Sequence, residues 1–238
     1  MNQLQLYREN GFPNIQGWVA PAQLAFVDLI AKTQDAAGIT GHAAEIGVYH
    51  GKFLLALASV LQSGGKVTAL DVFNDQDKNL DKSGVGDKEI LIRNVETYGR
   101  RDLDYAYIQA DSSALTILDK VSLVRDRGPF RLFSVDGCHT AEHTLSDLQT
   151  ARDCIAPGGV VILDDYMQPH WPGVTEAASI FCREAPRVVP FLFAYHKLYF
   201  VGVGWHETFL RAVTDALSEY PNARLTTMFG NRVLSIYP

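Results

Sequence analysis

The stretch that decides the fold is Ala43-Ala44-Glu45-Ile46-Gly47-Val48-Tyr49-His50-Gly51. A short apolar run ends in Glu45, two glycines frame a turn, and a helix-like segment follows from Lys52 to Gln62. Glycines Gly47 and Gly51 would stand where a ligand must approach the backbone closely. The pattern therefore predicts the strand–turn–helix unit of a nucleotide-type α/β fold.

The same stretch indicates a cationic ligand. No register of G-x-G-x-x-G passes through Gly47 and Gly51, so the dinucleotide pattern is absent. A pyrophosphate binds bare backbone amides at a helix start, whereas Glu45 would place a carboxylate at the end of the strand. S-adenosylmethionine carries a sulfonium and an amino group but no phosphate. The stretch therefore indicates a site for a cationic ligand of this kind.

Composition narrows the class of protein. The chain has 238 residues, 47% of them hydrophobic and 20% charged, which is typical of a globular protein. Its net charge of −6 gives no basic field for nucleic acid or an anionic membrane. No apolar run approaches the roughly 20 residues that span a bilayer. With no signal-peptide pattern and no framework spacing in its three cysteines, we expect a cytoplasmic protein with reduced thiols.

Strand and helix signals alternate along the chain, which predicts right-handed βαβ units in a doubly wound, mostly parallel sheet of seven strands. The last two strands are joined by a short turn, so we expect an antiparallel terminal hairpin. The candidate strands are Ala43–Gly47, Val67–Asp71, Tyr105–Gln109, Phe130–Val135, Val160–Leu163, Val188–Ala194 and Leu198–Val203. The candidate helices after the first strand are Lys52–Gln62, Asp87–Tyr98, Ser113–Val121, Ala141–Ile155 and Val174–Arg183.

We expect a single domain over residues 1–238, with a helical extension at 1–41, a core at 42–204 and a C-terminal helix and hairpin at 205–238. The helix of the extension would begin at Pro21 and run to about Gln34. The C-terminal hairpin could pair across the interface of a homo-oligomer.

Ligands of open α/β sheets bind outside the carboxyl ends of the strands, and several acids fall there. Asp71 closes the second strand, where a carboxylate can accept hydrogen bonds from both hydroxyls of a ribose. Asp111 and Ser112 follow the third strand, where the adenine amino group would need an acceptor. A helix cap explains Asp111 and Ser112 equally well.

A second group of acids ends the fourth and fifth strands. Asp136, Asp164 and Asp165 would crowd one spot, because adjacent strands lie about 5 Å apart. Like charges at that distance are unfavourable without a cation, so the group predicts a hard ion, with Mg²⁺ favoured and Mn²⁺ or Ca²⁺ as alternatives. Asp164 or Asp165 could instead be a cap or loop residue.

His139 follows Asp136 by three residues and is the candidate general base for a metal-bound hydroxyl. It could also bond the backbone at a helix end or act as a fourth metal ligand, and His143 and His170 are weaker candidates for the base. The segment 166–173, with Trp18, could wall a substrate pocket or simply pack. Segment 73–88 is long and polar for a loop and is interpreted as a lid or as a mobile connection.

With these residues in view, the chain resembles class I S-adenosylmethionine-dependent methyltransferases. It looks most like a small bacterial branch with the signature Glu-Ile-Gly-x-x-x-Gly, then Asp-Gly-x-His, then Gly-Gly-x-x-x-x-Asp-Asp, and the resemblance covers about residues 18 to 203. It implies that Glu45, Gly47 and Gly51 line the methionine part of the cofactor and Asp71 the ribose, with Asp136 also at the cofactor site.

Metal-dependent relatives, the catechol and antibiotic-sugar O-methyltransferases, bind Mg²⁺ with acids that match Asp136, Asp164 and Asp165. The sugar enzymes carry a proposed base that matches His139. The resemblance therefore implies a Rossmann-like, metal-assisted O-methyltransferase that acts on a hydroxylated small molecule.

Two other functions are compatible with the same residues. Three acids with His139 could hold iron in a hydroxylase of this fold, or the chain could be a non-catalytic module that binds S-adenosylmethionine. The missing glycine pattern makes a nicotinamide-dependent oxidoreductase the least favoured alternative.

Overall fold

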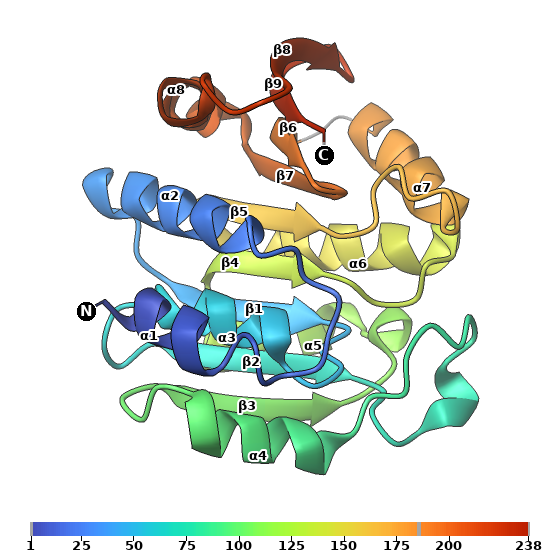
Figure 1. Ribbon diagram of the computed structural model, residues 1–238. Coiled ribbons are helices and arrows are strands. Elements are labelled where there is room, and N and C mark those ends of the chain that lie inside the picture. The colour runs from blue at the N-terminus through green and yellow to red at the C-terminus, as the bar shows by residue number, and fades with distance from the viewer. Residues whose placement is uncertain (1, 185–186, 238) are drawn as a thin grey trace.

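The computed structural model describes residues 2–184 and 187–237. Within them, nine strands form one twisted sheet in the order β3-β2-β1-β4-β5-β7-β6-β9-β8, with helices on both faces (Figure 1). The strands are β1 His42–Ile46, β2 Lys66–Asp71, β3 Asp104–Gln109, β4 Phe130–Val135, β5 Ile155–Leu163, β6 Val188–Ala194, β7 Lys197–Gly202, β8 Ala223–Met228 and β9 Asn231–Ile236.

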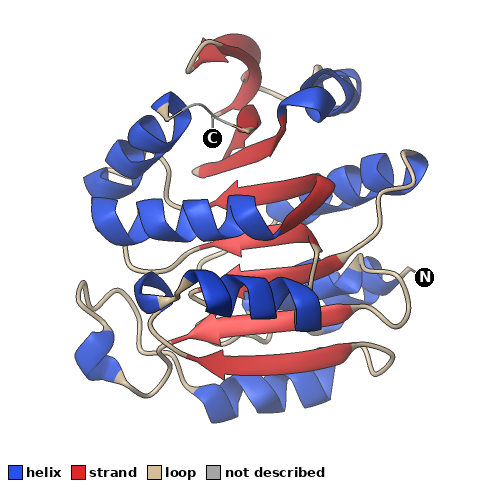
Figure 2. Cartoon of the chain, turned by 180° about the vertical axis from the view of Figure 1, so that it is seen from behind, coloured by secondary structure: helices blue, strands red, loops and turns tan. Residues whose placement is uncertain are grey.

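The helices divide between the two faces of the sheet, as opposite views show (Figures 1 and 2). Helices α1 to α4 and α8 pack on one face, and α5, α6 and α7 pack on the other. They are α1 Gln3–Asn10, α2 Gln23–Ala36, α3 Lys52–Ser59, α4 Lys88–Tyr98, α5 Ile117–Arg127, α6 Ala141–Cys154, α7 Pro172–Arg183 and α8 His206–Leu217, with short 3₁₀ turns η1 Gln76–Lys78, η2 Ser112–Ala114 and η3 Val203–Trp205.

The order of the strands determines where a ligand can bind. The chain places β2 and β3 on one side of β1 and then returns to place β4 on the other side, with all of these strands parallel. The switch between β1 and β4 opens a crevice at their carboxyl ends, which is where open α/β sheets bind ligands. The expected doubly wound, mostly parallel fold is confirmed.

The sheet is two strands wider than the seven expected. β6 and β7 form the predicted antiparallel hairpin, but this hairpin does not end the sheet. All seven residues of β6 are buried, and its outer edge pairs in parallel with β9 of the C-terminal hairpin. Helix α1 was not predicted, because only Leu4 and Tyr7 of its eight residues are buried. The assignment of residues 1–238 to one domain stays a prediction.

The turn between β6 and β7 determines the position of Lys197. Tyr195 and His196 both have positive φ, 50° and 64°, which is the backbone of the two-residue hairpin turn that suits the twist of the strands. β7 then pairs antiparallel with β5, with Leu198 opposite Leu163. Lys197, one residue earlier, therefore lies beside Asp164.

Gly47 at the end of β1 is the position where the fold depends most on glycine. Its φ is +77°, and a Cβ there would lie 1.8 Å from the backbone oxygen of Asp136. Gly38 has a similar φ of +70°, but nothing lies within 4 Å of its Cβ position. Gly38 is therefore a matched control that isolates backbone strain from the clash.

We expect Gly38→Ala to lower the free energy of unfolding by about 1 kcal/mol, since it adds only left-handed strain. Gly47→Ala should lower it by roughly 2–3 kcal/mol more, because the β4 turn must move away. Urea unfolding of both variants measures the difference. Equal losses in the two variants would show that Asp136 does not constrain Gly47.

Candidate active site

A cavity of about 420 Å³ opens at the carboxyl ends of β1, β2, β4 and β5. It brings together most of the residues that the sequence singled out. Those that line it are Glu45, Gly47, Asp71, Asp111, Ser112, Asp136, His139, Asp164 and Asp165. Gly51 is not among the lining residues; it precedes α3, and a Cβ there would lie 2.4 Å from Cδ1 of Leu91. Packing against α4 therefore explains this glycine, and its contact with a cofactor stays a prediction.

Asp71 ties the end of β2 to the turn after β1. Its Oδ2 accepts hydrogen bonds from the backbone nitrogens of Val48 (2.7 Å) and Tyr49 (3.0 Å), and Oδ1 accepts one from Phe73 (2.6 Å). Burial raises the pKa of Asp71, although these three donors oppose the rise. The carboxylate thus stands at the wall of the cavity in a fixed orientation.

Asp111 has the capping role that the sequence left open. Its Oδ1 accepts hydrogen bonds from the backbone nitrogen and the hydroxyl of Ser113 at the start of η2, at 2.9 and 2.7 Å. Asp111 and Ser112 also line the cavity, so capping and ligand contact are compatible here.

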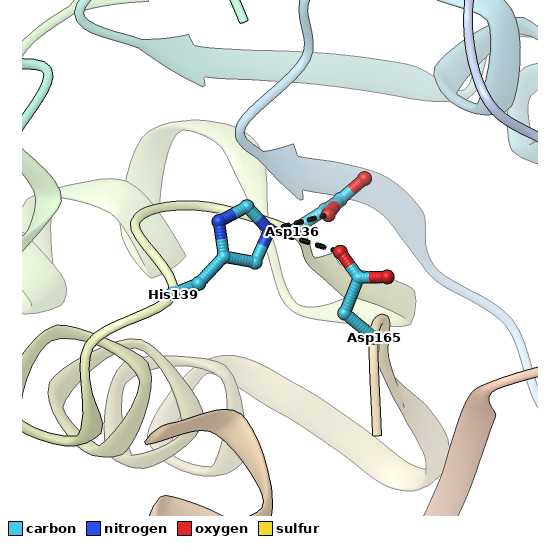
Figure 3. A group of neighbouring side chains, drawn as sticks. All are labelled: Asp136, His139 and Asp165. Atoms are coloured by element: carbon cyan, nitrogen blue, oxygen red, sulfur yellow. Dashed lines mark ion pairs between the residues drawn. The ribbon is translucent and has the colours of Figure 1, made fainter. Parts of the chain in front are cut away.

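Asp136, His139 and Asp165 form the group of side chains that could hold a metal ion (Figure 3). One donor atom from each lies within 4.8 Å of the others. Nε2 of His139 points between the two carboxylates, 3.0 Å from Oδ2 of Asp165 and 3.9 Å from Oδ1 of Asp136. Asp165 reaches this place from a left-handed backbone conformation, with a φ of 54°.

Asp164, the third acid of the predicted metal set, is engaged elsewhere. Its Oδ2 forms a close ion pair with Nζ of Lys197, and its Oδ1 accepts a hydrogen bond from the backbone nitrogen of Asp165 at 2.8 Å. The structure therefore gathers two acids and a histidine, whereas the sequence predicted three acids.

Lys197 was missed by sequence reasoning. It is only 2% exposed, and its Nζ lies 4.3 Å from the centre of the Phe53 ring. Burial lowers its pKa, but the charges of Asp164 and Asp136 outweigh burial and raise it. Glu45 belongs to the same cluster: burial raises its pKa to about 8 despite Lys197, and its buried Oε2 has no hydrogen-bond partner among the described residues.

The His139 ring has polar contacts at both nitrogens and an aromatic contact on its face. Nδ1 lies 2.7 Å from Oδ2 of Asp81, a residue of segment 73–88 that sequence reasoning also missed. The ring stacks on Trp171 with a centroid distance of 4.3 Å. Burial lowers the pKa of His139, but the hydrogen bonds to Asp165 and Asp81 outweigh it and raise the pKa to about 9. The two neighbouring carboxylates therefore favour the protonated form of the imidazole.

The other candidates have lesser roles. His143 and Trp18 line the cavity, while His170 is not among the lining residues. Tyr166 is buried and packs edge-on against Phe193, so packing explains it better than a pocket wall. Burial raises the pKa of the Cys138 thiol, which makes this cysteine a poor nucleophile.

Asp147 of α6 packs against the turn after β4. It is fully buried, and neither carboxylate oxygen has a hydrogen bond of normal geometry among the described residues, although the Ser112 side chain lies near enough to oppose the rise in its pKa. A Cβ on Gly137 would lie 2.7 Å from its Oδ2, so the carboxyl group fills the space that a side chain at 137 would need. Burial raises the pKa of Asp147 to about 7.

A family model described as a methyltransferase domain matches residues 44–166, more than half of the chain. The chain belongs to this methyltransferase family. The match spans β1 through the residues after β5, and so includes every acid of the site together with His139. The resemblance to class I S-adenosylmethionine-dependent methyltransferases is confirmed, and the iron hydroxylase and the non-catalytic module are not favoured.

Solved structures share the fold of this methyltransferase. The O-methyltransferase NovP gives a TM-score of 0.62 at 16% identity, over 77% of this chain and 81% of NovP. An O-methyltransferase from Bacillus cereus in complex with SAH gives 0.51 at 19% identity, over 83% of this chain and 88% of that one. MycE from the mycinamycin biosynthetic pathway, in complex with Mg and SAH, gives 0.55 at 16% identity, over 85% of this chain and 55% of MycE.

No match was found among curated proteins. Across residues 2–184 and 187–237, every helix is too short or too polar to cross a membrane.

We expect Lys197→Met to lower the free energy of unfolding by about 3 kcal/mol, because it leaves the largely buried Asp164 carboxylate without its counter-charge. Lys32→Met is the control: it breaks an exposed pair with Asp28 and should cost less than about 1 kcal/mol. Adding Asp164→Asn to Lys197→Met should restore part of the loss. Urea unfolding measures all three, and equal losses in the two single variants would contradict the prediction.

Asp147 should make stability depend on pH. Unfolded aspartate titrates near about pH 4, so between roughly pH 4 and 7 the folded protein keeps a proton that the unfolded chain has lost. The free energy of unfolding should fall through this window, by roughly 3–4 kcal/mol more than in Asp147→Asn. Unfolding at a series of pH values tests this, with the exposed Asp215→Asn as a control that follows wild type. Parallel curves for wild type and Asp147→Asn would refute it.

Proposed function

We propose that this methyltransferase transfers the methyl group of S-adenosylmethionine to a hydroxyl oxygen of a small molecule, with assistance from a divalent cation. The observation that carries the proposal is the position of His139, whose Nε2 faces two carboxylates at the carboxyl edge of the sheet. A base beside a cation site is what deprotonation of a hydroxyl requires.

The acids nearest β1 suit the cofactor. The unpartnered Oε2 of Glu45 offers a buried acceptor to the positive end of S-adenosylmethionine. Asp71 stands at the end of β2, the place for ribose hydroxyls, and Asp111 with Ser112 follows β3 at the place for adenine. Bound there, S-adenosylmethionine would supply the methyl group from its sulfonium. The sulfur then becomes a neutral thioether, and S-adenosylhomocysteine is the leaving group.

The donor set fits a hard divalent cation. Asp136 and Asp165 would hold it, and burial together with Asp164 and Asp165 raises the pKa of Asp136, the mark of carboxylates that need a positive partner. Mg²⁺ is commonly bound by one or two carboxylates with water and substrate oxygens in the other positions. Such an ion would polarise the acceptor hydroxyl and neutralise the charges that hold the proton on His139.

His139 then has the role of general base. Its Nδ1 is occupied by Asp81, so Nε2 is the nitrogen that faces the acceptor. Trp171 and His143 border the same part of the cavity, so the acceptor would lie between the imidazole and the cofactor. Holding the acceptor oxygen in line with the sulfonium methyl group would provide much of the rate acceleration.

Labelled S-adenosylmethionine with a panel of catechols, polyphenols and sugars tests the proposal. We expect methyl transfer to a hydroxyl that is lost on chelation and restored by Mg²⁺ or Mn²⁺. Asp165→Asn should lower turnover by roughly 100-fold or more while cofactor affinity stays close to wild type, because the carboxylate serves the cation and not the cofactor. Asp153→Asn, on the surface of α6, is the control.

Different negative results would contradict different parts of the proposal. Turnover that survives both chelation and Asp165→Asn would overturn the role of the cation. Binding of S-adenosylmethionine with transfer only to nitrogen or carbon would overturn the hydroxyl acceptor.

A further inference from the structure

Segment 73–88, between β2 and α4, carries Asp81 to the far side of the cavity. Oδ2 of Asp81 accepts a hydrogen bond from the backbone nitrogen of His139 at 2.7 Å and lies 2.7 Å from its Nδ1. Oδ1 accepts a hydrogen bond from the backbone nitrogen of Ser83 at 3.0 Å. The side chains of Asp81 and His139 are each only 9% exposed. A side chain of this surface segment therefore contacts the imidazole of the site.

These contacts hold the segment in place. Apart from Asp81, whose carboxylate also faces the Cys138 thiol, no residue of positions 76–86 forms a hydrogen bond to a residue outside 72–88 in the described part of the chain. Phe73 is buried at the start of the segment, but the large apolar side chains of positions 76–86, Leu80 and Val85, are 60% and 67% exposed. Hydrophobic burial therefore anchors the base of the segment and not positions 76–86. A segment with so few attachments opens locally at low free-energy cost.

The segment is also braced within itself and forms part of the cavity wall. Nδ2 of Asn79 donates hydrogen bonds to the backbone oxygen of Gly84 (2.6 Å) and to Oε1 of Gln76 (2.8 Å). A Cβ on Gly86 would lie 3.2 Å from Oδ1 of Asp71. The segment therefore contacts Asp71 at the cofactor end of the cavity and His139 at the other end. The wall residues that it supplies are Lys78, Asn79, Ser83, Gly84 and Gly86.

The orientation of His139 depends on the same contact. The ring lies at 17° to the Trp171 indole, and this stacking fixes its plane. Rotation within that plane is fixed by Asp81 at Nδ1 and by Asp165 at Nε2. Displacement of segment 73–88 would remove Asp81 and leave Nδ1 and the backbone nitrogen of His139 without their acceptor.

We propose that Asp81 is a positioning residue that couples closure of segment 73–88 over the cavity to the orientation of His139. The imidazole faces the acceptor site only when the segment is closed. The coupling is a property of the folded chain, whereas its effect on catalysis rests on the proposed methyl transfer.

The experiment compares Asp81→Ala, Asp81→Asn and Asp81→Glu with Asp77→Asn, an exposed acid on the same segment. Two readouts need no turnover. Hydrogen exchange followed by mass spectrometry reports opening at residues 76–86. Tryptophan emission reports the stacking of His139 on Trp171, and repeating each comparison in a Trp171→Phe background assigns the signal to that residue.

In Asp81→Ala we expect exchange at 76–86 to rise roughly tenfold or more. We also expect tryptophan emission to change, with no change in the Trp171→Phe background. Asp81→Asn keeps the size of the side chain and one acceptor oxygen, so its values should be intermediate, and Asp81→Glu should lie closest to wild type. Asp77→Asn should match wild type in both readouts. Unchanged exchange would overturn the lid, and faster exchange with unchanged emission would overturn its coupling to His139.

Kinetics separate this inference from the proposed function. Where methyl transfer is measured, Asp81→Ala should lower kcat by roughly tenfold to 100-fold, because the base is misplaced, while affinity for S-adenosylmethionine changes less. Equal losses in kcat and in cofactor affinity would show a structural role only. If wild type transfers no methyl group to any hydroxyl, the proposed function fails, while exchange and emission still decide the coupling.

Discussion

The site depends on one electrostatic constraint, the gathering of carboxylates at the carboxyl edge of a parallel sheet. β1, β4 and β5 are neighbours, and strands in a sheet lie about 4.8 Å apart, so Glu45, Asp136 and the acids after β5 must share a small volume. Such a group is stabilised by positive partners or by protons that some of its members retain. Lys197 supplies one charge from β7, the contacts with Asp165 and Asp81 favour the protonated form of His139, and the same group of acids suits a cationic ligand.

Local sequence predicted the parallel half of the fold well, because its signals lie within single elements. The glycines after β1 and the strand–helix alternation are short-range patterns, and the structure confirms the seven strands they indicated. The width of the sheet was not predictable in the same way. The joining of β9 to β6 is a contact between Leu192 and Leu234, 42 positions apart, and depends on an outer edge of β6 that no local pattern describes.

The residues missed at the site share this physical cause. Lys197 follows Asp164 by 33 positions and reaches it only because the β6–β7 turn sets the register of β7 on β5. Asp81 is one of several acids in a polar segment, and only its tertiary contact with His139 distinguishes it. Asp147 lies in an ordinary helical sequence, and its importance comes from Gly137, which leaves room for its carboxyl group. Composition and spacing contain none of these contacts.

Under the proposed function, Lys197 would also influence which acids are available to a cation. The lysine holds Asp164, and Asp164 in turn accepts a hydrogen bond from the backbone nitrogen of Asp165, so the two adjacent acids point to different partners. Three free carboxylates would surround an ion with more negative charge and fill more of its coordination positions. Two carboxylates are sufficient for Mg²⁺, which keeps its other positions for water or substrate oxygens. Under the proposed function, a buried lysine that does not line the cavity would thus leave the cation with positions open to the acceptor, beside the base that must deprotonate it.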